Sequence, residues 1–433
     1  MVRTALIVAS AWSLALGAQA QTLSLADAQR RAVERSRLLV AQDSAVASSR
    51  EMAVAAGQLP DPVLRFGIDS LPVTTVPGVQ AFSLTQDSFT SRRIGVMQEF
   101  TREEKRQLRG QRFEREVDKS LAEKAAATAA IQRDTALAWL DRYYAEAMAA
   151  VIAEQSRQVK LEILAAESAY RGGRGNQADV FAAHSTLVGL EDRASEFNRR
   201  IRTAKTGLAR WVGDGADAPL AGTPAINSIR LDPGALDTQL AHHPQIVVFS
   251  KLEEIAATEA RLAQANKNSD WSLEVMYSQR GPAFSNLVSV GVSIPLQWDQ
   301  ANRQDRELAS KLAMVEQARA QREEALRAHI GEVRAMLTEW ENGRERLARN
   351  ERELIPLAGE RTRAALTAYM GGKSSLTDLL LARRNETDVR MQAVQLEMET
   401  ARLWAQLNFL IPDGFGTTNV PAHSSTNQTK EAK

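Results

Sequence analysis

One glycine turn occurs twice in this chain, and this repetition constrains the fold more than any other feature. The stretches YRGGRGNQAD at 170–179 and YMGGKSSLTD at 369–378 each have a Tyr, a Gly-Gly pair and an Asp nine places after the Tyr. Aligning them gives an offset of 199 residues, which holds without a gap from 170–213 to 369–412. The sequence therefore predicts a tandem repeat of two halves of about 200 residues.

Both halves are expected to have the same order of elements. Each opens with a helical run of about 35 residues, continues with two strands, and then runs helical for about 70 residues to its glycine turn, after which a helix returns. Residues 111–171 contain neither Gly nor Pro and are rich in good helix formers. The predicted boundaries are 21–213 and 236–411 for the repeats, near 62–100 and 270–297 for the strand pairs, 214–235 for a connector and 412–433 for a flexible tail.

Local signals mark where these helices begin and bend. Ser24, with Asp27 three residues later, forms a capping-box pattern, and Asp232 is followed by Pro233 in the first helical position. Pro356 lies inside the last long helix, where it removes one backbone hydrogen bond. We therefore expect that helix to bend near Pro356.

The predicted strands alternate between apolar and polar or small residues. In the second half Val288, Val290 and Val292 alternate with Ser289 and Gly291. The first half repeats the pattern, with Gln98 as an outlier on the apolar side. Four such strands cannot close a barrel alone, because about eight are needed, so a membrane-spanning barrel would have to be shared between chains. The alternative is a half-buried sheet on a soluble core.

The N-terminal segment and the composition bear on location. Residues 1–20 carry one Arg, an apolar stretch and an Ala18-x-Ala20 ending, which predicts a cleaved secretory signal peptide. The chain has no Cys, so it has neither a disulfide nor a lipid-bearing cysteine. Its net charge of +1, with charges of both signs intermixed, gives no indication of a nucleic-acid partner.

Helix capping alone accounts for the residues of the two glycine turns. Asn176 and Ser375 are predicted N-caps, with Asp179 and Asp378 three residues later in the capping-box position. Four glycines are expected to supply left-handed backbone at the end of the preceding long helices. They are Gly172, Gly173, Gly371 and Gly372.

No catalytic, cofactor or metal site is predicted. The adjacent His242 and His243 diverge on a helix, and His184, His329 and His423 have no partner at ligand spacing. The sequence contains no Gly-x-Ser-x-Gly, phosphate-binding loop or His-Glu-x-x-His motif. The chain is therefore not expected to be an enzyme.

The duplicated order of helix, strand pair, long helix, Tyr-x-x-Gly turn with a following Asp, and helix resembles the TolC family of outer-membrane efflux proteins. The resemblance covers the whole chain after residue 20. It implies a mainly α protein with a small β part, whose long antiparallel helical hairpins form an α-barrel in a homotrimer. Its four strands per chain would contribute to a shared twelve-stranded transmembrane β-barrel in outer-membrane lipid. Periplasmic adaptor (membrane fusion) proteins and inner-membrane pumps would be the partners.

Two stretches resemble one branch of this family in particular. GQLPDPVLRFGIDSLPV and VMQEFTREEKRQLRG resemble the heavy-metal (CzcC/CusC-like) branch, which serves resistance-nodulation-division pumps. That branch has glycines where this chain reads EFTREEKRQ, which weakens the match. The implied function is an exit duct that passively conducts heavy-metal cations. The alternatives are a drug, multidrug or type I secretion duct, and a periplasmic coiled-coil adaptor or scaffold without a pore.

The family's closed tip is latched by a Tyr and a basic residue of one turn that bond to the acid of the neighbouring turn. Carried over by position, the resemblance assigns Tyr369 and Lys373 against Asp179, with Asp378 as a constricting ring, and includes Tyr170 at the tip. Family members often carry a second acid three residues further on, where this chain has Leu381. This difference implies a tip that is less selective for cations.

Overall fold

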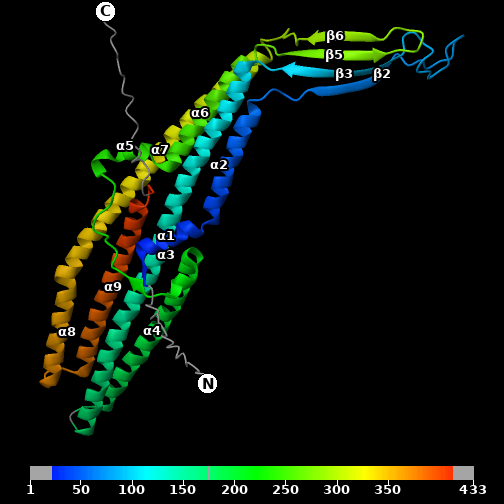
Figure 1. Ribbon diagram of the computed structural model, residues 1–433. Helices are drawn as coiled ribbons and strands as arrows, with labels where there is room; N and C mark the ends of the chain where they lie inside the picture. The colour runs from blue at the N-terminus through cyan, green and yellow to red at the C-terminus, as the bar shows by residue number, and fades with distance from the viewer. Residues whose placement is uncertain (1–21, 174, 413–433) are drawn as a thin grey trace, which may run out of the picture. The chain divides into compact units, whose positions relative to one another are not determined.

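The computed structural model describes residues 22–173 and 175–412, and within them the chain is mainly helical with a small sheet part (Figure 1). The prediction of a mainly α chain with a small β part is therefore confirmed. The predicted signal peptide, and the predicted tail from residue 413 on, lie outside the described residues. Among the described residues, no helix is both long enough and apolar enough to cross a membrane.

Most of the described residues lie in helices, several of them long (Figure 1). They are α1 (Leu25–Arg35), α2 (Arg37–Ala56), α3 (Glu103–Arg171), α4 (Gln177–Val212), α5 (Leu236–Ala241), α6 (Pro244–Ala265), α7 (Gln304–Arg349), α8 (Ile355–Met370) and α9 (Leu376–Asn408). Short helical segments are η1 (Gly213–Asp217), η2 (Pro233–Ala235) and the π-type η3 (Asn350–Leu354). The strands are β1 (Leu23–Ser24), β2 (Val63–Asp69), β3 (Ser91–Phe100), β4 (Leu220–Ala221), β5 (Trp271–Gln279) and β6 (Leu287–Ser293).

The described chain divides into two compact units. The helical unit comprises 22–36, 130–230 and 335–410, and the sheet-bearing unit comprises 37–129, 231–334 and 411–412. Both long helices, α3 and α7, contribute residues to both units.

Two helical hairpins, α3–α4 and α8–α9, pack together in the helical unit. Their shared core is apolar and includes Ile152 and Val159 of α3, Leu190 of α4, and Leu376 and Leu379 of α9. Each helix contributes residues spaced three or four apart, because this spacing keeps them on one face. Burial of this face against the other hairpin is the main stabilising term for helices of such polar composition.

Tryptophans tie the non-helical segments to the helices of this unit. Trp139 of α3 donates its indole N–H to the backbone carbonyl of Leu23 at 3.1 Å, and Trp340 of α7 donates to Ile226 at the same distance. The two donors lie 116 and 114 residues after their acceptors, so the two bonds have nearly the same spacing along the chain. Both indoles are buried, and each N–H therefore needs a partner that these carbonyls supply.

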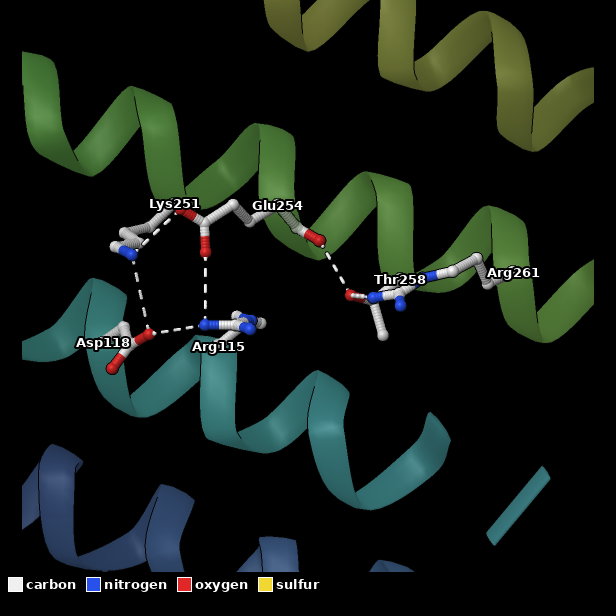
Figure 2. A network of polar contacts seen from close by, with 6 residues as sticks. All are labelled: Arg115, Asp118, Lys251, Glu254, Thr258 and Arg261. Carbon is white, nitrogen blue, oxygen red and sulfur yellow. Dashed lines mark hydrogen bonds and ion pairs between the residues drawn. The ribbon is translucent and has the colours of Figure 1, made fainter. Parts of the chain in front are cut away.

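Polar contacts join α3 to α6 in the sheet-bearing unit (Figure 2). Arg115 of α3 lies 3.4 Å from Glu254 of α6, and Lys251 of α6 lies 3.6 Å from Asp118 of α3. Both helices therefore contribute one base and one acid to a crossed set of ion pairs. Because these groups are about one-quarter to one-half exposed, each pair adds little stability, and together they fix which faces of the helices meet.

The larger sheet has the strand order β2-β3-β5-β6, and all three of its strand pairs are antiparallel. Its two hairpins, β2–β3 and β5–β6, come from distant parts of the chain and meet along β3 and β5. Gly95 permits this pairing, since a Cβ at that position would lie 2.6 Å from the carbonyl oxygen of Val275. The sheet is thus one continuous surface built from both halves of the chain.

The opening helical run of each half is shorter than the sequence indicated. The first is divided at Ser36, whose backbone is extended (φ −67°, ψ 111°), into α1 and α2. The second is divided at His242 and His243, and α6 restarts with Pro244 in its first turn. Proline is tolerated there because its missing N–H would have no partner in a first turn. By contrast, the predicted starts at Ser24 and Asp232 are confirmed by side-chain caps.

Candidate gate at the two glycine turns

The second glycine turn ends α8 with a complete Schellman motif. The Gly372 N–H donates to the Tyr369 carbonyl at 3.0 Å, and the Lys373 N–H donates to the Ala368 carbonyl at 2.8 Å. Gly372 has φ +68°, a left-handed conformation that glycine adopts without steric cost. These two bonds give donors to the carbonyls of Ala368 and Tyr369 in the last turn of α8.

The first turn repeats this geometry as far as it is described. The Gly173 N–H donates to the Tyr170 carbonyl at 3.0 Å, and Gly173 has φ +70°. The expectation that all four glycines supply left-handed backbone is wrong for the first glycine of each pair. Gly371 has φ −79°, and Gly172 is likewise not in the left-handed region. Each of these two glycines directly follows the helix, and only the next residue adopts the left-handed conformation that reverses the chain.

Both predicted N-caps are present after the turns. Asn176 Oδ1 accepts from the Asp179 N–H at 2.8 Å at the start of α4. At the start of α9, Ser375 Oγ accepts from the Asp378 N–H at 3.2 Å, and the Asp378 carboxylate accepts from the Ser375 N–H and hydroxyl at 3.1 and 2.7 Å. These hydrogen bonds from Ser375 hold the pKa of the exposed Asp378 carboxyl below its ordinary value. Asp378 is thus bonded within its own turn.

The structure brings Tyr369 and Asp179 into electrostatic range of each other. Tyr369 is half-buried against the core of the helical unit. Burial first, and then the negative charges of Asp179 and Glu162, raise the pKa of its phenol. Within the described residues, however, Tyr369 makes no hydrogen bond to Asp179, and the exposed Lys373 forms no ion pair with it. Tyr170 at the matching position is 47% exposed.

A buried ion pair that the sequence reasoning missed lies next to these groups. Arg383 of α9 bonds Glu162 of α3 through both Nε and Nη2, each 2.9 Å from Oε1, and the side chains are only 15% and 7% exposed. Burial raises the pKa of Glu162 even though Arg383 favours its charged form. The signal was present in the sequence, because Glu162 follows Val159 by three places and Arg383 follows Leu379 by four, which puts both charges on apolar helix faces.

No metal site accompanies these groups. Over 22–173 and 175–412, no set of three or more His, Asp or Glu side chains is arranged to hold a metal ion.

Comparison with known proteins gives a result only at the level of structure. No protein-family model matches the sequence, and no curated protein matches it. Among solved structures, the outer membrane protein VceC from Vibrio cholerae is 19% identical, with a TM-score of 0.69 over 89% of this chain and 95% of VceC. CusC, described in connection with folding and transmembrane channel formation, is 15% identical, with a TM-score of 0.74 over 89% and 91%. The CmeC outer membrane channel of Campylobacter jejuni is 12% identical, with a TM-score of 0.73 over 91% and 87%.

The fold is that of these outer-membrane proteins. The long helical hairpins and the small sheet that the sequence predicts are therefore shared with these structures. The chain covers nearly the full length of each of these structures, so the fold as a whole is shared and not only one hairpin. At identities below 20% this likeness establishes the fold alone.

Proposed function

We propose that three copies of this chain form the outer-membrane exit duct of a tripartite efflux system of the TolC family. The observation that carries the proposal is the exposed apolar face of the sheet β2-β3-β5-β6. The duct would be passive, because the energy for transport would come from an inner-membrane pump.

Two rows of apolar side chains cross all four strands of the sheet. One row runs from Leu64 through Val96 and Val275 to Val290, and the other runs from Phe66 through Ile94 and Tyr277 to Val288. Every one of these eight side chains is exposed, and Phe66 and Val288 are 83% and 69% exposed. Such a contiguous apolar patch is costly in water and favourable against lipid.

The opposite face of the sheet is polar, as the wall of an aqueous passage would be. Arg65 Nη1 lies 3.1 Å from Glu274 Oε1, and Arg93 pairs with Asp69. Gly67, Gly95 and Gly291 also fall on this face, where small residues would leave room for water. One face is thus apolar and the other polar, as the wall of a barrel between lipid and water requires.

The outer strands β2 and β6 each pair on one side only in the four-stranded sheet. An open edge leaves backbone N–H and C=O groups unpaired, which is not tolerated in hydrocarbon. Pairing β2 of one copy with β6 of the next would remove every edge. Three copies would then give a closed barrel of twelve strands, which is above the minimum of about eight.

The two turns would lie at the periplasmic tip of the duct. Threefold symmetry would repeat Asp378 as a ring of carboxylates that attracts cations. Asp179 would accept from Tyr369 and Lys373 of a neighbouring turn in the closed state. The proximity of Asp179 to Tyr369 supports this assignment, as does the exposure of Lys373, which leaves it free to reach an acid. The glycines 172, 173, 371 and 372 would keep the turns tight.

Location, partners and substrate complete the proposal. Residues 1–20 would be a signal peptide that directs export, the barrel would lie in outer-membrane lipid, and the helices would reach into the periplasm. A membrane fusion adaptor and a resistance-nodulation-division pump would dock at the tip. Heavy-metal cations are the proposed substrate, supported by the resemblance of 57–73 and 96–110 to the CzcC/CusC-like branch.

Membrane fractionation tests the duct, and a deletion strain tests the substrate. The protein should be recovered in the outer-membrane fraction as a trimer that migrates differently before and after heating. A protein found wholly soluble would contradict the duct and favour a periplasmic scaffold. A strain lacking it should become sensitive to cobalt, zinc, cadmium, nickel, copper or silver salts. Sensitivity only to hydrophobic drugs and detergents would retain the duct and reject the metal substrate.

A further inference from the structure

A polar cavity of about 310 Å³ lies between α3, α4 and α9 in the helical unit. This volume is at the lower end of the range for small-molecule sites. Its lining residues come from all three helices, so a bound ligand would contact both hairpins. They are Gln155 and Val159 of α3, Ser185, Thr186, Gly189, Leu190 and Arg193 of α4, and Arg383, Arg384 and Thr387 of α9.

The lining contains three arginines and no carboxylate. The acids that partly neutralise these arginines lie outside the lining. Arg193 Nη1 is 3.3 Å from Asp388 Oδ1, and Arg384 Nε is 3.9 Å from Asp388 Oδ2, so two guanidinium groups share one carboxylate. Arg383 bonds Glu162 through two of its three nitrogens. Among these ion pairs, three arginines are thus matched by two carboxylates.

Gln155 belongs to the lining of the cavity, and its side-chain oxygen accepts no hydrogen bond from the described residues. Its residue is 4% exposed, and its Oε1 is buried without a hydrogen-bond partner among the described residues. A buried acceptor without a partner costs about 1–3 kcal/mol, which a ligand O–H could recover. Gly189 leaves space nearby, because a Cβ at that position would meet no atom within 4 Å.

We propose that this cavity is a binding site for a small oxyanion that also carries an O–H donor, such as hydrogen phosphate or a hydroxycarboxylate. Guanidinium groups match the planar oxygen pairs of carboxylate and phosphate, and the site offers three. The O–H group would donate to Gln155 Oε1 once the side-chain amide rotates this buried oxygen towards the ligand. By bridging Arg193 of α4 to Arg383 and Arg384 of α9, the ligand would hold the two hairpins in the arrangement seen here. The inference rests on the cavity alone and holds whether or not the chain is an efflux duct.

Titration calorimetry on the full-length protein in detergent, at one ionic strength set with sodium chloride, tests the site. Hydrogen phosphate at pH 7 should bind at least fivefold more tightly than sulfate, and citrate at least fivefold more tightly than tricarballylate, which lacks the hydroxyl group. If neither phosphate nor citrate binds, the proposal is wrong. Equal binding within both pairs would also contradict it, since Gln155 would then have no role.

Variants locate the binding. Arg193→Gln and Arg384→Gln should each weaken citrate at least fivefold, and Gln155→Leu should remove the preference for citrate over tricarballylate. Arg363→Gln is the matched control, because Arg363 is an exposed α8 arginine paired with Glu360 outside the cavity. Citrate binding that the control weakens as much as the cavity variants do would reflect general charge attraction and overturn the site. Circular dichroism checks that each variant is folded, and Arg193→Lys offers a milder substitution that keeps the charge.

Discussion

At the scale of single residues, Asp378 has an observed role as a helix cap and a proposed role in the gate, and two variants separate them. Ser375→Ala removes the capping hydroxyl and keeps the charge, so it should lower stability by about 0.5–2 kcal/mol and leave cation selectivity unchanged. Asp378→Asn removes the charge and should reduce the preference for cations. Thermal unfolding and reversal potentials in planar bilayers measure the two effects. Unchanged selectivity in Asp378→Asn would leave Asp378 as a cap alone.

The buried pair of Glu162 and Arg383 gives the second residue-scale prediction. Arg383→Met leaves a buried carboxylate without its partner, which should cost about 3–5 kcal/mol. The double variant Glu162→Leu with Arg383→Met should recover most of that loss, because two apolar side chains then meet in an apolar core. Unfolding midpoints of the single and double variants measure this coupling. If the two single losses simply add, the pair does not act as a unit.

At the scale of elements, the π-type segment η3 lies directly before Pro356, where the sequence predicts a bend. Pro356 has no N–H to give to the Arg352 carbonyl, and the preceding segment Asn350–Leu354 takes the wider π form, with the Ile355 N–H bonded to the Asn350 carbonyl. Pro356→Ala should restore regular α-helix and slow amide hydrogen exchange in 352–357. A π segment that persists in this variant would be imposed by packing and not by proline.

The contact between α6 and α7 should respond to acid. The rings of His243 and His329 contact each other with centroids 4.4 Å apart and planes tilted by 47°. Burial lowers the pKa of His329, although Glu332, 4.0 Å away, acts in the opposite direction. Glu123 of α3 lines the same cavity as His329 and Glu332, and is the other acid there. The folded state therefore binds the His329 proton less readily than the unfolded state does.

This difference fixes the sign of the pH dependence. The unfolded imidazole titrates near pH 6.5, so stability should be full above that pH and should fall as the pH drops through 6.5 towards the lower folded pKa. His329→Gln should flatten the stability profile between about pH 7 and pH 5. Urea unfolding at several pH values measures the slope, and His184→Gln, at an exposed histidine, is the control. Equal slopes in wild type and His329→Gln would exclude this histidine as the source.

Elements that depend on local pattern were predictable, and contacts between distant segments were not. Alternation in 288–292 predicts a strand, and the helix caps at Ser24, Asn176 and Ser375 follow from the residue types. The contact between His243 and His329 was not predicted, because nothing in a one-dimensional pattern brings residues that far apart together. The Glu162–Arg383 pair was missed for the same reason, although each charge lay visibly on an apolar face.

At the scale of the whole molecule, assembly depends on which face of the sheet meets lipid. Val290 belongs to one apolar row, whereas its neighbour Ser289 pairs with Met276 on the opposite face. Val290→Arg would put a charge into hydrocarbon, which costs about 2–4 kcal/mol near the bilayer midplane in each of three copies. It should abolish the heat-modifiable trimer in the outer-membrane fraction.

Ser289→Arg is the matched control, since the same side chain one position away would point into the aqueous passage. This variant should assemble normally and change ion conductance only. The comparison holds residue type, strand and depth nearly constant, and changes only the face, because successive side chains of a strand alternate. If both variants assembled equally well, the rows through Val290 would not face lipid, and the proposed barrel of three chains would be wrong. If only Ser289→Arg failed to assemble, the face that carries Arg65 and Arg93 would be the one that meets lipid. Charged side chains are too costly in hydrocarbon for that arrangement, so this outcome would also contradict a membrane-embedded sheet.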